Sequence, residues 1–427
     1  MYKFKHFIYL ILFILLFTGC SYKNIKIADL DKYPQNPELY TKNITQTLDD
    51  QSQLTKEYLD KYFWPWSLKK ANITKKDAQW GNIYKNKKVY LENNNLASKE
   101  WFEKVIDNSN FEVFNTASQK AIMVKNANVR VFPTISKLFY NPSVAGEGFP
   151  FDYNQNSSIK INTPIFISHY SKDKAWAYIQ SHFVSGWVRV DNLALVSDEF
   201  INSFKTQEYG VAIKDNFPIF DSSFIEYIKI GTLFPNKNGK YLVAKKNIDA
   251  YATFSQINND AISKFPLKFS KENISKLSSE FLGELYGWGG LLSHRDCSSF
   301  TQDFFSPFAV YLNRNSKAQS KGYKYLDISK LSSNEKKEFI IKNGVPFLTL
   351  IYLPGHIMIY IGAKDNEPLA MHNMWGVRTW KYPFVQGRNV VGKTVITTLE
   401  PGAELDMANP FASIIKKVKG IVILNEK

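Results

Sequence analysis

The segment "RDCSSFTQDFF" (residues 295–305) is the most informative part of this sequence. Its phenylalanines Phe300 and Phe304 lie four positions apart, which indicates a helix with one apolar face. Cys297 stands where that helix should begin, directly after Asp296. A thiol in the first turn of a helix meets the positive end of the helix dipole and unpaired backbone N–H groups. Both favour the thiolate, so we expect a lowered pKa and a sulfur that can attack a carbonyl carbon.

Histidines elsewhere in the chain are candidates for the base that such a thiol needs. His356 opens a predicted strand after Pro354 and Gly355, and His372 lies on the next predicted strand. Neighbouring antiparallel strands can bring two such side chains together, so that one imidazole takes the thiol proton and the second orients the first. A structural role for each histidine is the alternative, and His294 is a bystander close to the thiol in sequence.

The first twenty residues are typical of an export signal. Basic residues precede an apolar run, residues 7–17, that is shorter than the roughly 20 residues of a membrane span. The ending "FTGC" (17–20) resembles the lipobox of bacterial lipoproteins, which makes Cys20 the candidate lipidation site; an N-terminal anchor helix is the alternative. If Cys20 carries lipid, Cys297 has no disulfide partner and is either a reactive thiol or an inert buried one.

Composition excludes several classes of protein. The chain has 427 residues, 44% hydrophobic and 15% aromatic, which is enough for several folded domains and argues against disorder. Its net charge of +15 comes from lysines scattered along every segment, so we expect no nucleic-acid partner. The sequence contains neither HExxH nor a GxxxxGK phosphate loop, and we expect no metal and no cofactor.

The pattern along the chain predicts a multidomain protein. Helical spacing gives way to short strands with turns every eight to twelve residues, as in small β-barrels, and then to helices followed by antiparallel strands, an α+β pattern. The segment "SGWVRV" (185–190) resembles the closing strand of bacterial SH3-type domains. We predict these parts: 1–20 lipoprotein signal peptide, 21–45 tether, 46–116 mainly helical N-terminal cap segment, 117–200 and 201–265 SH3-like domains, and 266–427 catalytic domain.

Four motifs of the last domain carry a family resemblance. They are "YGWGG" (286–290), "RDCSSF" (295–300), "GHIMIYIG" (355–362) and "MHNMWG" (371–376). In this order and spacing they resemble the NlpC/P60 papain-like cysteine peptidases. The resemblance implies a papain-like catalytic domain in which Cys297 is the nucleophile, His356 the base and His372 the orienting residue.

The same resemblance implies substrate contacts. Tyr286 would lie near the oxyanion site, and Asp296, Ser298 and Ser316 would contact substrate; an N-cap role is the alternative for Asp296. The upstream part resembles a subgroup with two SH3-like domains, whose first barrel restricts the cleft to stem peptides with a free L-alanine amine. The segment "GEGFPFDYNQNS" (146–157) resembles the barrel segment concerned, so that Glu147 and Tyr153 are candidates for this wall.

The resemblance also implies a substrate and a location. Family members of this type cleave the bond between γ-D-glutamate and a diamino acid, meso-diaminopimelate, in cell-wall peptides. We therefore expect a monomeric peptidoglycan hydrolase that acts on stem peptides or muropeptides. We expect it to be attached by its lipid anchor to the periplasmic face of a bacterial membrane, the outer one. Two alternatives stay open: a non-catalytic wall-binding lipoprotein, and an acyl or amide transferase that uses the same cysteine and histidine.

Overall fold

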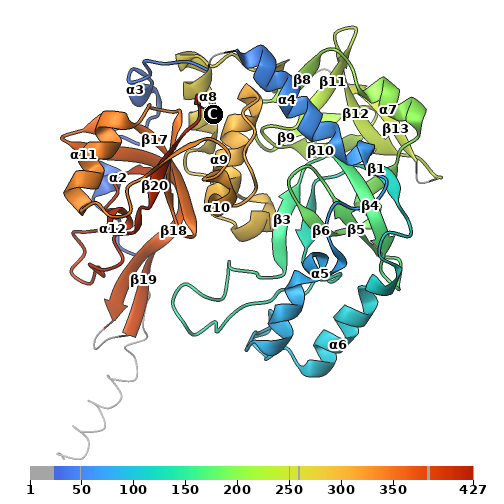
Figure 1. Ribbon diagram of the computed structural model, residues 1–427, viewed down its shortest axis with the longest axis horizontal. Coiled ribbons are helices and arrows are strands. Elements are labelled where there is room, and N and C mark those ends of the chain that lie inside the picture. Colours follow the sequence, from blue (N-terminus) through green and yellow to red (C-terminus); the bar gives the residue numbers. More distant parts are fainter. Residues whose placement is uncertain (1–23, 49, 250, 258–259, 382–384, 427) are drawn as a thin grey trace, which may run out of the picture.

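The computed structural model describes residues 24–48, 50–249, 251–257, 260–381 and 385–426. The predicted signal peptide and Cys20 lie outside these described residues. Figure 1 shows the C-terminal strands on one side, the strands of the middle of the chain on the other, and helices α8 (Lys271–Phe281) and α9 (Cys297–Phe305) between them. The multidomain α+β fold predicted from the sequence is confirmed. Within the described residues, no helix is long and apolar enough to cross a membrane.

The N-terminal cap segment is mainly helical, and side-chain caps begin its longer helices. The Asp50 side chain accepts the Gln53 N–H at 3.1 Å. The buried Trp66 donates its Nε1–H to the Ala121 carbonyl at 2.8 Å, which joins this segment to the strands that follow. The helices are α4 (Gln51–Phe63), α5 (Lys75–Ala78) and α6 (Lys99–Asn108), with 3-10 turns η1 (Trp64–Ser67), η2 (Trp80–Asn86) and η3 (Phe111–Val113).

Two strand units follow the helical segment. The first is a seven-stranded sheet in the order β3-β2-β6-β5-β4-β1-β7, and the second is a five-stranded sheet in the order β13-β12-β11-β8-β14 with the separate hairpin β9–β10. Helix α7 (Asp198–Phe204) joins the two units. The strands are β1 (Gln119–Met123), β2 (Ala127–Arg130), β3 (Gln155–Ile159), β4 (Pro164–Tyr170), β5 (Trp176–Gln180), β6 (Ser185–Arg189), β7 (Leu193–Leu195), β8 (Tyr209–Ala212), β9 (Phe217–Phe220), β10 (Phe224–Ile228), β11 (Leu233–Lys237), β12 (Lys240–Lys246), β13 (Ala252–Ile257) and β14 (Ile262–Phe265).

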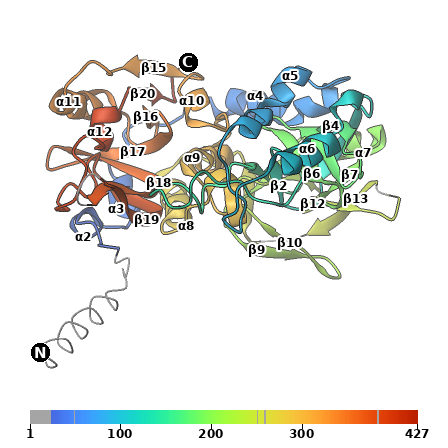
Figure 2. The same cartoon turned by 90° about the horizontal axis from the view of Figure 1, so that it is seen from below.

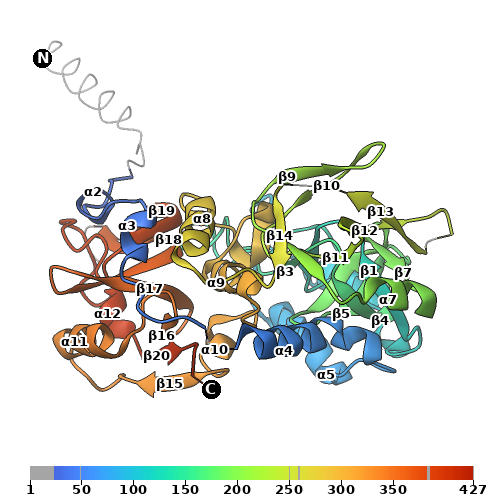
Figure 3. The same ribbon diagram turned by 90° about the horizontal axis from the view of Figure 1, so that it is seen from above.

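The last domain places two helices against a six-stranded sheet of order β15-β20-β16-β17-β18-β19. Helix α9 packs on β17 and β18, as Figure 3 shows, because its phenylalanines face the core. This contact brings the start of α9 to the strands that carry the histidines. The elements are β15 (Lys324–Asp327), β16 (Thr349–Leu353), β17 (His356–Lys364), β18 (Glu367–Lys381), β19 (Val385–Thr397), β20 (Gly420–Ile423), α10 (Ser316–Gln319), α11 (Ser333–Asn343), α12 (Ile414–Lys417) and the 3-10 turns η5 (Trp288–Ser293) and η6 (Ser306–Phe308).

The segment predicted as a tether is instead packed against the catalytic domain. We call residues 24–48 the strap; it contains α2 (Asp29–Lys32) and α3 (Glu38–Thr41), and α2 lies beside β19 in Figure 2. Tyr33 is 1% exposed and packs into the core of the catalytic domain. The Asp29 carboxylate accepts hydrogen bonds from Thr398, from N–H at 2.7 Å and from the hydroxyl at 2.8 Å. The tether prediction is therefore wrong for the described residues, because buried aromatic side chains and a paired carboxylate fix the segment.

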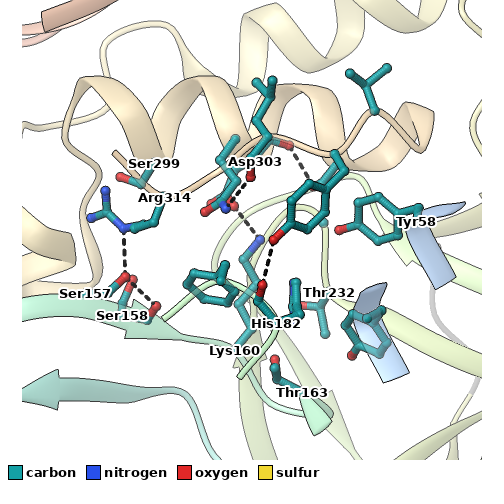
Figure 4. A pocket seen from close by; sticks show the side chains of 18 residues that line it. Tyr58, Ser157, Ser158, Lys160, Thr163, His182, Thr232, Ser299, Asp303 and Arg314 are labelled. Carbon is teal, nitrogen blue, oxygen red and sulfur yellow. Dashed lines mark hydrogen bonds and ion pairs between the residues drawn. The ribbon is translucent and has the colours of Figure 1, made fainter. Parts of the chain in front are cut away.

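Buried charges hold the strand units to the catalytic domain. A cavity of about 40 Å³ lies at this junction, and Figure 4 shows the side chains that line it. Among them, Lys160 Nζ of the first strand unit lies 2.5 Å from Asp303 Oδ1 of α9. Arg295, which is 2% exposed, bonds Asp303 at 2.7 Å, Asp215 of the second strand unit at 2.9 Å and Glu284 at 2.8 Å. Ion pairs from both strand units thus reach the catalytic domain at Arg295, just before α9, and at Asp303, within α9.

Candidate active site

Cys297 is the first residue of α9, where the sequence predicts the helix to begin. Asp296 is the N-cap: its carboxylate accepts the Ser299 N–H at 2.8 Å, and the Ser299 hydroxyl bonds the Asp296 N–H at 2.9 Å. This reciprocal pair is a capping box, which fixes the backbone on both sides of the thiol. The helix N-terminus therefore presents its N–H groups beside the sulfur.

The sulfur borders a cavity although Cys297 is only 7% exposed. We call this space of about 440 Å³ the thiol-side cavity. The thiol donates to the Gly355 carbonyl at 3.9 Å, and the Ile357 and Ser298 N–H groups bond the sulfur. The two neighbours of His356 in the chain thus both touch Cys297, which places the start of β17 against the start of α9.

The acidity of the thiol differs from the expectation drawn from the sequence. Burial, followed by the negative charge of Asp296, raises the pKa of Cys297 to about 12, whereas the helix position predicts a lowered pKa. Burial also lowers the pKa of His356 to about 4. Both shifts favour a neutral thiol beside a neutral imidazole. For a neutral thiol, a nucleophilic role requires a base in contact that removes the proton as the sulfur attacks.

His356 and His372 lie within hydrogen-bond distance of one another. The distance from His356 Nε2 to His372 Nδ1 is 2.8 Å, and that from His372 Nε2 to Thr397 Oγ1 is 3.0 Å. The Thr397 hydroxyl donates to the Thr398 carbonyl at 2.7 Å, so it accepts the His372 Nε2–H. Burial, together with the charge of His356, holds the pKa of His372 well below its usual range. A neutral His372 then accepts the His356 Nε2–H and leaves Nδ1 of His356 as the basic nitrogen.

Asp296 is neutralised by an arginine that sequence reasoning missed. Arg314 donates to both carboxylate oxygens, at 2.8 and 3.1 Å, and also to the Ser298 hydroxyl at 2.9 Å. Burial opposes the charge of Asp296, but the Arg314 guanidinium and the helix cap hold its pKa below the ordinary value. Arg314 lies two residues before Ser316, within the "RNSKAQ" segment, and that proximity was the available signal.

The structure brings most predicted substrate contacts to the thiol-side cavity. Tyr286, Asp296, Ser298, Ser316 and Tyr153 all line it together with Cys297. Glu147 is half-buried and does not line this cavity, although its charge acts on Tyr153, whose pKa rises to about 12 mainly through burial. The N-terminal cap segment completes the wall with Ile73, Trp80 and Tyr84, which sequence reasoning did not assign to the site.

A second cavity, of about 620 Å³, adjoins the first on the other side of the histidine. We call it the imidazole-side cavity because His356 lines it and Cys297 does not. Tyr286, Trp288 and Gly355 line both cavities. Burial raises the pKa of Tyr286 well above its usual range, so its hydroxyl keeps its proton and can donate a hydrogen bond. The described residues contain no group of three or more histidine, cysteine or carboxylate side chains placed to hold a metal ion.

Comparisons with known proteins agree with this geometry. Family models match at residues 9–114 (NLPC_P60 stabilising domain, N term), 137–189 (SH3 domain, SH3b1 type) and 283–378 (NlpC/P60 family). An NlpC/P60 endopeptidase structure from Photobacterium damselae subsp. piscicida aligns with a TM-score of 0.84 at 24% identity, covering 92% of this chain and 98% of that one. An NlpC/P60 family protein from Bacillus cereus ATCC 10987 aligns with a TM-score of 0.48 at 14% identity, covering 71% and 99%.

No protein with a curated description matches the chain by sequence. The three family models nevertheless follow one another in the order that the described domains have along the chain. NlpC/P60 is a family of cysteine peptidases, and in this chain the thiol of Cys297 lies against the start of the strand that His356 begins. Residues 283–378 therefore match the NlpC/P60 family, and they follow matches to an N-terminal stabilising domain at residues 9–114 and an SH3 domain at residues 137–189.

Proposed function

We propose that this protein is a peptidoglycan hydrolase that cleaves the bond between γ-D-glutamate and a diamino acid, meso-diaminopimelate, in stem peptides with a free N-terminal L-alanine. The observation that carries the proposal is the chain of contacts from Cys297 through the start of β17 to His356, His372 and Thr397. A buried nucleophile, a base and an orienting group bordering a cavity are what acyl transfer requires.

The tautomers of His356 and His372 determine which nitrogen exchanges protons in the proposed reaction. Nδ1 of His356 takes the thiol proton as the sulfur attacks the γ-carbonyl carbon of D-glutamate. N–H groups at the start of α9 and the protonated Tyr286 hydroxyl stabilise the oxyanion. Collapse breaks the C–N bond, and the imidazolium of His356 gives its proton to the leaving amine. Water then attacks the thioester, with His356 again as base, and releases the acid and the free thiol.

The proposed end-specificity is supported by the thiol-side cavity. Its wall combines the Asp296 carboxylate, the Tyr153 hydroxyl and aromatic side chains of the N-terminal cap segment. An ammonium group is stabilised by a hydroxyl acceptor and by the faces of aromatic rings. A free L-alanine amine fits this description, whereas an amide-linked alanine carries no charge.

We further propose that the protein is an exported lipoprotein, attached through Cys20 to the periplasmic face of a bacterial membrane, the outer one. This proposal is supported by the sequence of residues 1–20 and by the proposed substrate, which is found outside the cytoplasm. Labelling cells with an alkyne fatty acid tests it: incorporation should depend on Cys20 and should be lost in Cys20→Ser.

The main experiment uses the full-length protein in detergent with L-Ala-γ-D-Glu-meso-diaminopimelate and its N-acetylated form. Mass spectra should show L-Ala-γ-D-Glu and free diaminopimelate from the first peptide only. Cys297→Ala should abolish both products without lowering the thermal unfolding midpoint by more than a few degrees. Cleavage of the acetylated peptide at an equal rate would rule out amine recognition. Unchanged products in Cys297→Ala would rule out the thiol mechanism, and transfer to added hydroxylamine in place of hydrolysis would favour a transferase.

A further inference from the structure

The imidazole-side cavity is lined by charged side chains that have no role in the proposed reaction. Four cationic side chains line it: Arg378 of β18, Arg388 of β19, and Lys416 and Lys417 at the end of α12. Its two carboxylates are Glu400 and Asp406. Glu400 is already bonded to Lys337 at 2.6 Å. Among the side chains that line this cavity beside His356, cations therefore outnumber carboxylates by four to two.

The cations are close enough to repel one another. Arg378 and Arg388 are direct partners in the pairing of β18 with β19, and like charges directly opposite in an antiparallel pair are destabilising. Burial lowers the pKa of Lys417, and the charges of Arg378 and Arg388 lower it further. Lys416 also lines the cavity, and its ammonium donates to the Pro410 carbonyl at 2.8 Å. A ligand that brings negative charge between the two arginines and Lys417 would relieve the repulsion.

The position of the cavity relative to His356 determines which part of a substrate contacts these charged side chains. In the proposed reaction the leaving amine receives its proton from His356, so the leaving segment lies on the imidazole side. The side of the acyl group is the thiol-side cavity, where Asp296 and Arg314 neutralise one another. In the lining of the imidazole-side cavity, Phe151 packs on Trp288 with ring centres 5.4 Å apart and on Trp375 at 5.7 Å. These rings offer an apolar wall to an aliphatic side chain.

We propose that the imidazole-side cavity binds a carboxylate at the far end of the leaving residue, and that Arg378, Arg388 and Lys417 thereby select a diamino acid with a second carboxylate over lysine. This inference rests on the proposed function, because that function defines the leaving residue. Arg388 and Lys417 lie beyond residues 283–378, the extent of the NlpC/P60 match, so this selectivity belongs to the β18–β19 hairpin and C-terminal loop of this chain.

The test compares two peptides that differ in one carboxylate, L-Ala-γ-D-Glu-meso-diaminopimelate and L-Ala-γ-D-Glu-L-Lys, on the full-length protein in detergent. The unaltered protein should have at least a tenfold higher kcat/KM for the first peptide, as expected for a charge-assisted hydrogen bond. The double variant Arg378→Gln, Lys417→Gln should lose most of this preference, with little change for the lysine peptide. Arg378→Lys should retain it. Lys364→Gln, an exposed cation at the far end of β17, is the matched control and should change neither rate.

Binding to Cys297→Ala protein, measured by calorimetry, separates this inference from the proposed cleavage. Tighter binding of the diaminopimelate peptide that disappears in the double variant supports carboxylate recognition even if the active protein cuts neither peptide, which would overturn only the proposed function. Cleavage of both peptides with no preference, or an equal loss for both in the double variant, would overturn the carboxylate site and leave the hydrolase intact.

Discussion

At the scale of single residues, the proposed reaction depends on a proton that starts on Cys297 and has one basic nitrogen to receive it. The buried thiol, with a pKa of about 12, stays protonated at neutral pH, and His356, with a pKa of about 4, stays neutral. Nδ1 of His356 is basic only while His372 accepts its Nε2–H, and His372 does so only while Thr397 accepts from it. The Thr397 hydroxyl is therefore the side-chain group that ends this chain of hydrogen bonds.

Thr397→Val tests that dependence, because valine keeps the shape of threonine and removes the acceptor. We expect kcat to fall about tenfold with little change in KM, since an imidazole without its partner can adopt the wrong tautomer. The unfolding free energy should fall by about 1–3 kcal/mol, the cost of an unsatisfied buried donor. Thr397→Ser, which restores the acceptor, should recover most of kcat. Equal kcat values for the valine and serine variants would contradict a positioning role.

At the scale of elements, the start of α9 combines a helix cap, an ion pair and the nucleophile. Asp296→Asn should be severely destabilising because it leaves the buried Arg314 without a counter-charge. We expect a loss of about 3–5 kcal/mol of unfolding free energy. Ser299→Ala removes only the other half of the capping box, so its loss should be about 1 kcal/mol. Urea unfolding of the two variants measures the difference, and similar losses would mean that the ion pair adds nothing to the cap.

The elements also show what the sequence could and could not predict. The spacing of Phe300 and Phe304 and the position of Cys297 were sufficient for the helix and its start, because both are local patterns. Thr397 reaches the site through strand register, which no local pattern contains, and Arg314 reaches it through a loop whose local signal was the nearby Ser316. Burial of the thiol likewise depends on packing, and so the predicted direction of its pKa shift was wrong. The sequence did not predict that the strap is packed, because its helices α2 and α3 have only four residues each and show no periodic pattern.

At the scale of the whole molecule, burial of histidines makes stability depend on pH. Burial lowers the pKa of His169 and His356 to about 4 and that of His182 to about 3, and it holds the pKa of His372 well below its usual range. The unfolded chain binds these protons below about pH 6.5 and the folded chain does not, so stability decreases as the pH falls from about 6.5 towards 4. Buried carboxyls with raised pKa, such as Asp29, oppose this change, but the histidines are more numerous.

Thermal unfolding midpoints at pH 7.5, 6.0 and 5.0, at constant ionic strength, measure this effect. We expect the midpoint to decrease at each step. His169→Gln, which removes one titrating ring from the first strand unit, should weaken the dependence without changing its sign. A midpoint that stays constant or rises between pH 7.5 and 5.0 would contradict the dominance of the histidines.

The strap stabilises the whole molecule through a few side chains. Tyr40 is 6% exposed and packs in the core of the catalytic domain, whereas the preceding Leu39 is 48% exposed. Tyr40→Ala should cost about 3 kcal/mol of unfolding free energy, and Leu39→Ala, on the same short helix, less than about 0.5 kcal/mol. Chemical denaturation of both variants measures this contrast. Equal losses would mean that the strap contributes no specific packing.

The strap also joins the N-terminal end of the described residues to the strand end beside the histidines. Asp29 and Thr398 are 369 positions apart, and Thr398 follows the residue that orients His372. A polypeptide emerging from a ribosome makes Asp29 early and must wait for nearly its whole length before the partner strand appears. The last sheet can thus close around the histidines only once translation has passed residue 398, and a chain that terminates earlier lacks the contacts of Thr397 with His372 and of Thr398 with Asp29.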